Sequence, residues 1–232
     1  MTRKHKDIPD QSKLWDEQHK VRGTKGPEGY NLQNVPNESA IRLNNILPLK
    51  SRILEVGSAN GRDARYWATQ GHEVYALDFS QVALKQLKEL AIAQQVEQLI
   101  VPIVWNIAKG ILPLNSLPKN VGAFYARSAL HIGDGEMNLL AEQIDSILLP
   151  GGKILIEGKG AADRKIARSK KIGRGLALDE YENGHLRRVW DIDFVKKLCK
   201  KMGWSIINIG SNTEDWNGTQ ANFLSFLIQK DK

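Results

Sequence analysis

The sequence predicts an α/β fold, in which a doubly wound and mostly parallel sheet of seven strands alternates with helices. Three observations predict it. Short apolar runs alternate with amphipathic helical stretches along the chain, as in repeated strand–helix–strand units. A loop bracketed by Gly57 and Gly61 follows the first of these runs. An acidic residue, Asp78, ends the second run, where the parallel strands of such a sheet present their ligand-binding loops.

The first fifty residues precede the first core strand. Ser12 to Glu17 looks like a helix start, with a capping serine followed by acidic residues. The glycines and proline of 23–29 predict a loop that ends at Tyr30. Apolar residues over 41–47 predict a second helix, which stops before Pro48. The segment 1–50 is therefore an extension ahead of the domain formed by residues 51–232.

The central stretch runs from Arg52 to Ser80. Its elements in order are a strand over 53–56, a helix whose buried face is Ala64, Trp67 and Ala68, a glycine end at Gly71, and a strand over 74–77. Glycine at 57 and 61 permits a tight turn and a close approach of a bound cofactor to the backbone. Asp78 can accept hydrogen bonds from both hydroxyls of a ribose. The loop is not G-x-G-x-x-G, so no pyrophosphate cradle is implied. Glu55, two residues before the first glycine, suits a ligand with an amino group.

The remaining elements follow the same alternation. Ser80 can cap a helix with an apolar stripe over 83–91. Pro102 places the strand over 99–104 at an edge of the sheet, because proline cannot donate to a neighbouring strand. The next elements are a strand over 121–125, a helix from Met137 closed by Pro150-Gly151-Gly152, a strand over 153–157, a helix over 191–202, and strands over 204–209 and 223–228.

Composition sets broad limits on function. The 232 residues carry an ordinary apolar fraction of 41%, which suits one packed domain. Cys199 is the single cysteine, so no disulfide forms within the chain, and a cytoplasmic location is expected. No apolar run has the length of a membrane span. The net charge of +7 permits an acidic partner or nucleic acid without requiring one. No cluster of His, Cys and carboxylates has metal-ligand spacing, and no metal is expected.

The stretch Arg52 to Ser80 resembles motif I and the end of strand 2 in class I S-adenosylmethionine-dependent methyltransferases. The resemblance implies a Rossmann-like methyltransferase fold, S-adenosylmethionine as cofactor, and a lid role for the extension 1–50. Asn106, after the third strand, fits the place of the residue that contacts the adenine amino group, or it is a turn asparagine without a ligand. The cofactor-binding residues expected from the resemblance are Glu55, Gly57, Ser58, Asn60, Gly61, Asp78, Phe79, Ser80, Asn106, Ile107 and Arg127.

The run Ala126-Arg127-Ser128-Ala129-Leu130-His131 follows the fourth strand, beside the expected position of the transferable methyl group. Arg127 can orient an anionic or carbonyl-bearing acceptor, or it can anchor the loop. His131 can take a proton near neutral pH, or it caps a helix or lies satisfied in the core. These two are the candidate catalytic residues. Together with Gly71 to Ser80, the run also resembles the thiopurine and tellurite-resistance branch of small-molecule methyltransferases.

A basic insertion over 158–190 separates the fifth strand from the last helix. Insertions at this place in the family commonly form a substrate flap, although a basic run is more often a solvated helix face. Arg187 and Arg188 are the pair expected to point inward. Trp15 and Tyr30 are the lid candidates of the extension, and the alternative is that both pack on the sheet edge.

Four functions compete. The favoured one is methyl transfer to an S, N or O nucleophile of a small molecule, possibly anionic or heteroaromatic. The alternative is an RNA or protein methyltransferase that holds its substrate with the basic insertion; nucleic acid is possible but not favoured. A short-chain oxidoreductase needs a Tyr-x-x-x-Lys pair, and none of the five tyrosines has a lysine four residues on. A binding protein without catalysis is the fourth. The oligomeric state is not predictable.

Overall fold

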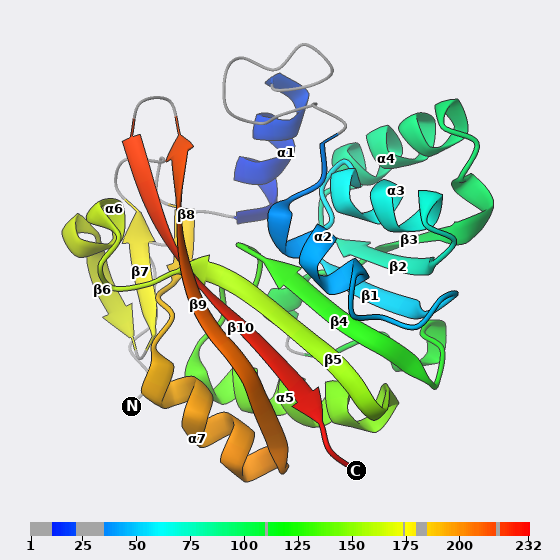
Figure 1. The fold of residues 1–232 in the computed structure, drawn as a ribbon. Helices are drawn as coiled ribbons and strands as arrows, with labels where there is room; N and C mark the ends of the chain where they lie inside the picture. The colour runs from blue at the N-terminus through cyan, green and yellow to red at the C-terminus, as the bar shows by residue number, and fades with distance from the viewer. Residues whose placement is uncertain (1–10, 22–34, 110, 174, 180–184, 217–218) are drawn as a thin grey trace.

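The computed structural model of the chain describes residues 11–21, 35–109, 111–173, 175–179, 185–216 and 219–232. Figure 1 shows a central sheet covered by helices on both faces. The helices are α1 Gln11–Val21, α2 Glu38–Asn44, α3 Arg62–Thr69, α4 Gln81–Ala93, α5 Asp134–Ile147, α6 Arg164–Arg168 and α7 Ile192–Met202. The strands are β1 Arg52–Val56, β2 Glu73–Asp78, β3 Ile100–Val104, β4 Val121–Arg127, β5 Leu148–Lys159, β6 Lys170–Gly173, β7 Leu176–Asp179, β8 His185–Arg188, β9 Trp204–Trp216 and β10 Thr219–Lys230.

The large sheet has seven strands in the order β3-β2-β1-β4-β5-β10-β9. All neighbouring pairs from β3 to β5 are parallel, whereas β10 is antiparallel to both β5 and β9. The predicted mostly parallel, doubly wound α/β sheet is therefore confirmed. Pro102 lies on β3 at one edge of the sheet, as its missing N–H requires.

Two apolar layers hold the helices to the sheet. Alternate strand residues such as Ile53 and Val74 point to the face covered by α2, α3 and α4, where Trp67 is fully buried. The intervening residues, such as Leu54 and Phe124, point to the face covered by α5 and α7. This alternation is the period of two that strands impose on their side chains. It fixes which strand residues end at the rim where ligands bind.

Local signals in the sequence account for several helix ends. The Ser80 hydroxyl accepts a hydrogen bond from the Ala83 N–H at 3.1 Å, which caps α4. Asp191 caps α7 in the same way, through the Phe194 N–H at 2.8 Å. Gly71 has a φ of 85° just past α3, the left-handed conformation that glycine adopts at low cost.

The hairpin of β9 and β10 is longer than any predicted strand. β9 spans 13 residues and β10 spans 12, and Figure 1 shows both extending past the ends of β1 and β4. Their pairing shifts register between Leu227, which pairs with Asn208, and Ile228, which pairs with Ile206. Ile207 is thus an extra residue on β9, in the manner of a β-bulge.

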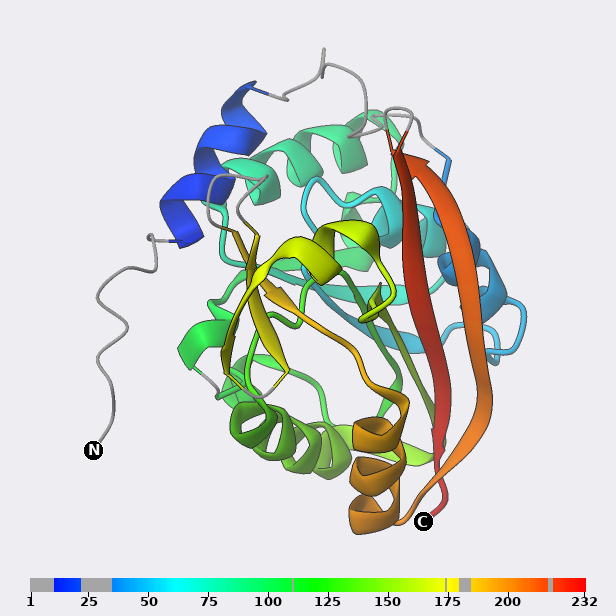
Figure 2. The same ribbon diagram turned by 90° about the vertical axis from the view of Figure 1, so that its left-hand side faces the viewer.

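The predicted basic insertion forms a small structure of its own. It contains α6 and an antiparallel three-stranded sheet in the order β6-β7-β8. Figure 2 shows this sheet at the side of the large one, with α1 above it beside α4. Ile166 and Ala177 are buried within it. The helix α1 contacts both α4 and β8, so the N-terminal extension and the insertion meet.

Candidate active site

A cavity of about 430 Å³ lies at the carboxyl ends of the parallel strands. The loops after β1, β2, β3 and β4 converge there, as the doubly wound rule predicts. The residues that line it come from these loops, from α1, and from the outer part of β9. They are Trp15, His19, Asn37, Glu55, Val56, Gly57, Ser58, Ala59, Asn60, Arg62, Asp63, Leu77, Asp78, Phe79, Trp105, Ile107, Tyr125, Arg127, Ser128, Ala129, His131 and Glu214.

The two loop glycines are needed for packing within the chain. Gly57 has a φ of 76°, and a β-carbon there would lie 2.2 Å from the β-carbon of Ala129. Gly61 has a φ of 74°, and a β-carbon there would lie 2.4 Å from Leu87 Cγ. The sequence suggested that the missing β-carbons make room for a cofactor. In the structure they let the loop after β1 lie against the loop after β4 and against α4.

Asp78 is held by the loop that it faces. Its Oδ2 accepts from the Ala59 N–H at 2.9 Å, and its Oδ1 accepts from the Ser80 N–H at 2.8 Å. Burial raises the pKa of Asp78 to about 6, despite these backbone hydrogen bonds, which act to lower it. Each carboxylate oxygen keeps further acceptor capacity toward the cavity. A ligand with two neighbouring hydroxyls fits this arrangement.

Glu55 supplies a second buried carboxylate at the cavity. Only 3% of the residue is exposed, and its Oε2 has no hydrogen-bond partner among the described residues. Burial, followed by the neighbouring charge of Asp63, raises its pKa well above the ordinary value. A buried acceptor without a partner is costly, and a bound ammonium group would remove that cost. The cavity thus offers a place for a cationic amine beside Glu55.

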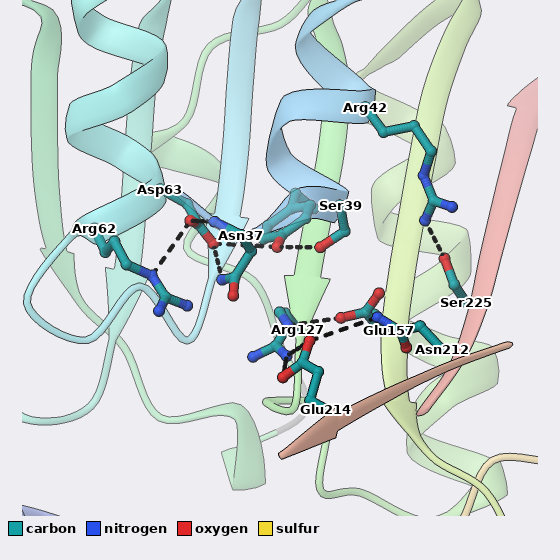
Figure 3. Close-up of polar contacts among 11 residues, drawn as sticks. Asn37, Ser39, Arg42, Arg62, Asp63, Arg127, Glu157, Asn212, Glu214 and Ser225 are labelled. Atoms are coloured by element: carbon teal, nitrogen blue, oxygen red, sulfur yellow. Dashed lines mark hydrogen bonds and ion pairs between the residues drawn. The ribbon is translucent and has the colours of Figure 1, made fainter. Parts of the chain in front are cut away.

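A buried polar network around Asp63 lies near Glu55, and Figure 3 labels Asn37, Ser39, Arg62 and Asp63 of this network. Asp63 accepts from the Asn37 main-chain N–H at 2.8 Å and from the Tyr125 hydroxyl at 3.1 Å. Tyr125 also bonds Ser39 at 2.9 Å, and Arg62 pairs with Asp63 at 3.6 Å. The network ties the segment before α2 to β4. The sequence reasoning missed Asn37, Asp63 and Tyr125, because no local spacing relates three segments so far apart.

Arg127 is shared between two carboxylates, as Figure 3 shows. Its Nε donates to Glu157 Oε1 at 2.6 Å, and its Nη2 lies 2.5 Å from both oxygens of Glu214. The side chain is 10% exposed and stacks over Phe223 at 4.8 Å. Burial acts to lower the pKa of Arg127, but the nearby carboxylates outweigh it and the pKa rises. The guanidinium expected to hold an anionic acceptor is therefore already neutralised.

His131 lines the cavity and is hydrogen-bonded to the main chain of β8 in the insertion. Its Nδ1 accepts from the Arg188 N–H at 3.2 Å, which places the proton of a neutral ring on Nε2. Arg187 Nη1 lies 3.5 Å from that Nε2. Both ring nitrogens thus face groups of the protein. A role for His131 as a proton acceptor stays a prediction, as do the capping and core alternatives.

The helix α1 lies against the cavity. Trp15 and His19 line it, Trp15 stacks on His185 with ring centroids 4.7 Å apart, and Arg187 lies 5.4 Å above the Trp15 ring. Asp16 accepts a hydrogen bond from the Ser80 hydroxyl at 2.6 Å. Of the two lid candidates, Trp15 is thus at the cavity, while Tyr30 falls outside the described residues.

Five other predicted site residues do not line the cavity. Gly61 packs on α4, and Ser80 is fully buried as the cap of that helix. The side-chain oxygen of Asn106 accepts a hydrogen bond from the Ala108 N–H at 2.9 Å, as expected for a turn asparagine without a ligand. The neighbouring Trp105, and not Asn106, lines the cavity. Arg188 is 2% exposed and pairs with Asp134 at 2.8 Å. Arg187 also lies outside the lining, and its guanidinium contacts two residues that do line the cavity, Trp15 and His131.

No described residue of the insertion 158–190 lines the cavity. Arg168, Lys170 and Lys171 are exposed on the outside of the small sheet and α6. The solvated-face interpretation fits these three side chains. Within the described parts of the chain, no group of three or more His, Cys, Asp or Glu side chains is placed to hold a metal ion. None of the described helices is both long and apolar enough to cross a bilayer.

Solved structures with this fold include several methyltransferases. The CcbJ methyltransferase from Streptomyces caelestis superposes with a TM-score of 0.69 at 17% identity, over 96% of this chain and 100% of that one. A 1,6-didemethyltoxoflavin-N1-methyltransferase from Burkholderia thailandensis, with 1,6-didemethyltoxoflavin and S-adenosylhomocysteine bound, gives 0.64 at 17% identity over 96% and 87%. TehB from Haemophilus influenzae gives 0.63 at 14% identity over 87% and 64%.

At these identities the superpositions establish the fold. No curated protein is significantly similar to the chain in sequence. The family model described as a methyltransferase domain matches residues 54–156, which run from β1 through the glycine loop and Asp78 into β5. The matched stretch therefore contains both features on which the resemblance rests, the glycine loop and Asp78, together with the strands that carry them. Residues 54–156 therefore form a methyltransferase domain of the class I S-adenosylmethionine-dependent type, an enzyme domain whose cofactor is S-adenosylmethionine.

Proposed function

We propose that the protein transfers a methyl group from S-adenosylmethionine to a small molecule bound in the cavity beneath α1. The observation that carries this proposal is the size and the lining of the cavity. Its described walls include Trp15 and His19 of α1 on one side and Glu214 of β9 on another. A space of about 430 Å³ with such walls suits ligands of cofactor and metabolite size better than a polymer.

The residues of the cavity fit the cofactor. Asp78 is placed to accept hydrogen bonds from the ribose hydroxyls, and Glu55 to pair with the amino group of the methionine part. Phe79, Trp105 and Ile107 supply apolar walls for the adenine ring. The cofactor provides a methyl group on a positively charged sulfur, and the protein has to exclude water and align the nucleophile. These assignments rest on the unpartnered Glu55 Oε2 and on the two-oxygen geometry of Asp78.

The acceptor end of the cavity lies near Arg127, Glu214 and His131. Arg127 ends β4, His131 follows it in the segment before α5, and Glu214 lies near the end of β9, whereas Asp78 ends β2. The Burkholderia neighbour has 1,6-didemethyltoxoflavin and S-adenosylhomocysteine bound together, which is an example of this fold holding a small molecule beside the cofactor product. The exposed positions of Arg168, Lys170 and Lys171 in the insertion give no comparable support to an RNA or protein substrate.

The experiment uses S-adenosylmethionine with a labelled methyl group. The purified protein is incubated with a cell extract that has been separated into small molecules, RNA and protein. We expect the label in the small-molecule fraction, and none there when Asp78→Asn protein is used at low cofactor concentration. Label in RNA or protein alone would reject the proposal. Calorimetry with S-adenosylhomocysteine, run in parallel, shows whether the protein batch binds the cofactor product.

A further inference from the structure

Glu214 stands at the acceptor end of the cavity, on a part of β9 that the sequence did not predict as strand. Its side chain is 33% exposed and lines the cavity, whereas the facing Glu157 of β5 is 2% exposed. Both carboxylates bind Arg127. Glu157 is thus the buried partner of this guanidinium, and Glu214 is the partner that a ligand in the cavity can reach.

The charged side chains around Arg127 do not favour the binding of an anion. Arg127 carries one positive charge and pairs with two carboxylates at 2.6 and 2.5 Å. Among the described side chains that line the whole cavity, four are carboxylates, namely Glu55, Asp63, Asp78 and Glu214, and two are guanidinium groups, Arg62 and Arg127. At Arg127 itself, two carboxylates stand against one guanidinium, and the potential there attracts cations and repels anions.

Three of the four lining carboxylates already have a role. Asp78 and Glu55 are assigned to the cofactor in the proposed function. Asp63 binds Asn37 and Tyr125 and lies beside Arg62. Glu214 is the remaining carboxylate of the described lining. Besides Arg127, the Asn212 amide donates to Glu214 at 3.5 Å, and the 33% exposure of the side chain keeps it within reach of an N–H of a ligand.

We infer that the methyl acceptor is an amine, and that Glu214 is the residue that binds its nitrogen. The inference rests on the proposed function and names its substrate class. The ammonium form of the acceptor is attracted into the cavity, and it gives up one proton to solvent before its nitrogen has an electron pair for the methyl group. An N–H that remains on the nitrogen is donated to Glu214 and fixes the orientation of that electron pair. Arg127 holds Glu214 in place and prevents it from turning away. The anionic acceptor considered from the sequence alone is thereby disfavoured.

A matched set of probes tests the charge preference without turnover. Benzylamine, benzyl alcohol and benzoate have the same ring and differ in charge. Each is titrated, by ligand-observed NMR, into protein saturated with S-adenosylhomocysteine. We expect benzylamine to bind at least tenfold more tightly than benzoate. Benzoate binding as tightly as benzylamine would overturn the inference.

Two variants separate Glu214 from a general charge effect. Glu214→Gln keeps the shape of the side chain, removes one negative charge and leaves Arg127 with Glu157 alone. We expect it to weaken benzylamine binding about tenfold and to strengthen benzoate binding, a reversal that a merely structural role would not produce. Glu142→Gln is the control, because Glu142 is an exposed carboxylate of α5 paired with Lys201, and it should change neither. Identical preferences in wild type and Glu214→Gln would overturn the assignment of Glu214.

The labelled products give an independent readout. Small molecules that carry the transferred methyl group are separated by ion exchange in acid. Retention on the cation exchanger supports an amine acceptor, and label in anionic or uncharged products overturns the inference while leaving the proposed function intact. Absence of label from all small molecules would reject the proposed function, and the inference with it.

Discussion

The Ser80 hydroxyl donates a hydrogen bond to Asp16 Oδ1 at 2.6 Å and, in the same position, accepts one from the Ala83 N–H. One side chain thus caps α4 and fastens α1 over the loop that carries Asp78. Because Trp15 and His19 of α1 line the cavity, we expect a ligand beneath them to leave more easily when this bond is broken.

The first prediction concerns Asp16→Ala. It removes the bond to Ser80 and leaves the α4 cap intact. We expect S-adenosylhomocysteine to dissociate roughly fivefold faster, since one hydrogen bond contributes about 1 kcal/mol. Stopped-flow tryptophan fluorescence can follow this, with Trp15 and Trp105 at the cavity as reporters. Glu17→Ala is the matched control, because Glu17 is exposed and pairs only with Lys20 of α1 among the contacts of its described side chain. Equal rates in the two variants would contradict a fastening role.

The second prediction concerns pH and Asp78. The carboxylate form accepts the hydroxyl protons of a ribose, and burial raises its pKa from 3.8 to about 6. The affinity for S-adenosylhomocysteine should therefore be constant above about pH 7 and fall as the pH drops through 6. Calorimetry in matched buffers measures this. In Asp78→Asn the affinity should be weaker by about 1–3 kcal/mol, and its dependence on pH in this range should disappear.

The same raised pKa has the opposite effect on folding. A group that binds its proton more tightly in the folded state stabilises the fold below its unfolded pKa, and this contribution is lost as the pH rises through the folded pKa. Without cofactor, the contribution of Asp78 to the free energy of unfolding is thus present below 3.8 and lost through about 6. Comparing urea unfolding of wild type and Asp78→Asn across this range isolates the contribution.

The third prediction is that Arg127→Met destabilises the fold as well as the site. The substitution leaves Glu157 buried without its cation, and breaking a buried pair from one side costs about 3–5 kcal/mol. Urea unfolding measures the change. The double variant Arg127→Met, Glu157→Gln should recover a large part of it, because the stranded charge is gone. In contrast, Arg52→Met breaks an exposed pair with Glu73 and should change the free energy of unfolding little.

The fourth prediction compares two glycines in the left-handed region. Gly57→Ala introduces backbone strain and a contact of 2.2 Å with the Ala129 β-carbon. Gly71→Ala introduces similar strain, at a φ of 85°, in open space. Strain alone costs about 1–2 kcal/mol, and overpacking adds about 1–3 kcal/mol at Gly57. Thermal unfolding should separate the variants, and an equal loss of stability in both would mean that the loop after β4 moves aside at no cost.

Much of the fold was predictable because its signals are local. Ser80 and Asp191 cap their helices, Pro102 marks an edge strand, and Gly71 ends α3, each through the conformations open to one residue. The positions of Glu55 and Asp78 at the cavity were predictable for a related reason. Both end strands whose carboxyl ends must meet in a doubly wound sheet.

The acceptor side was not predictable, and the physical reason is distance along the chain. Arg127 and Glu214 are 87 residues apart, and Tyr125 and Asp63 are 62 apart. Such pairs depend on the length of the β9–β10 hairpin and on the packing of α2, and no periodicity in the sequence reports either. The importance of Arg127 is predictable from its place at the carboxyl end of the fourth strand, but its two carboxylate partners are not.

Because of the bulge at Ile207, the side of the sheet on which each residue of the outer half of β9 lies depends on the exact number of residues in the strand. Successive strand residues face opposite sides, so one residue more or less reverses the side on which every later side chain stands. Ile207 is 50% exposed and lies seven positions before Glu214 along the chain. Deleting it would either slip the inner half of β9 out of register or turn Glu214 away from Arg127. Within this strand, length changes that preserve the cavity wall therefore come in steps of two.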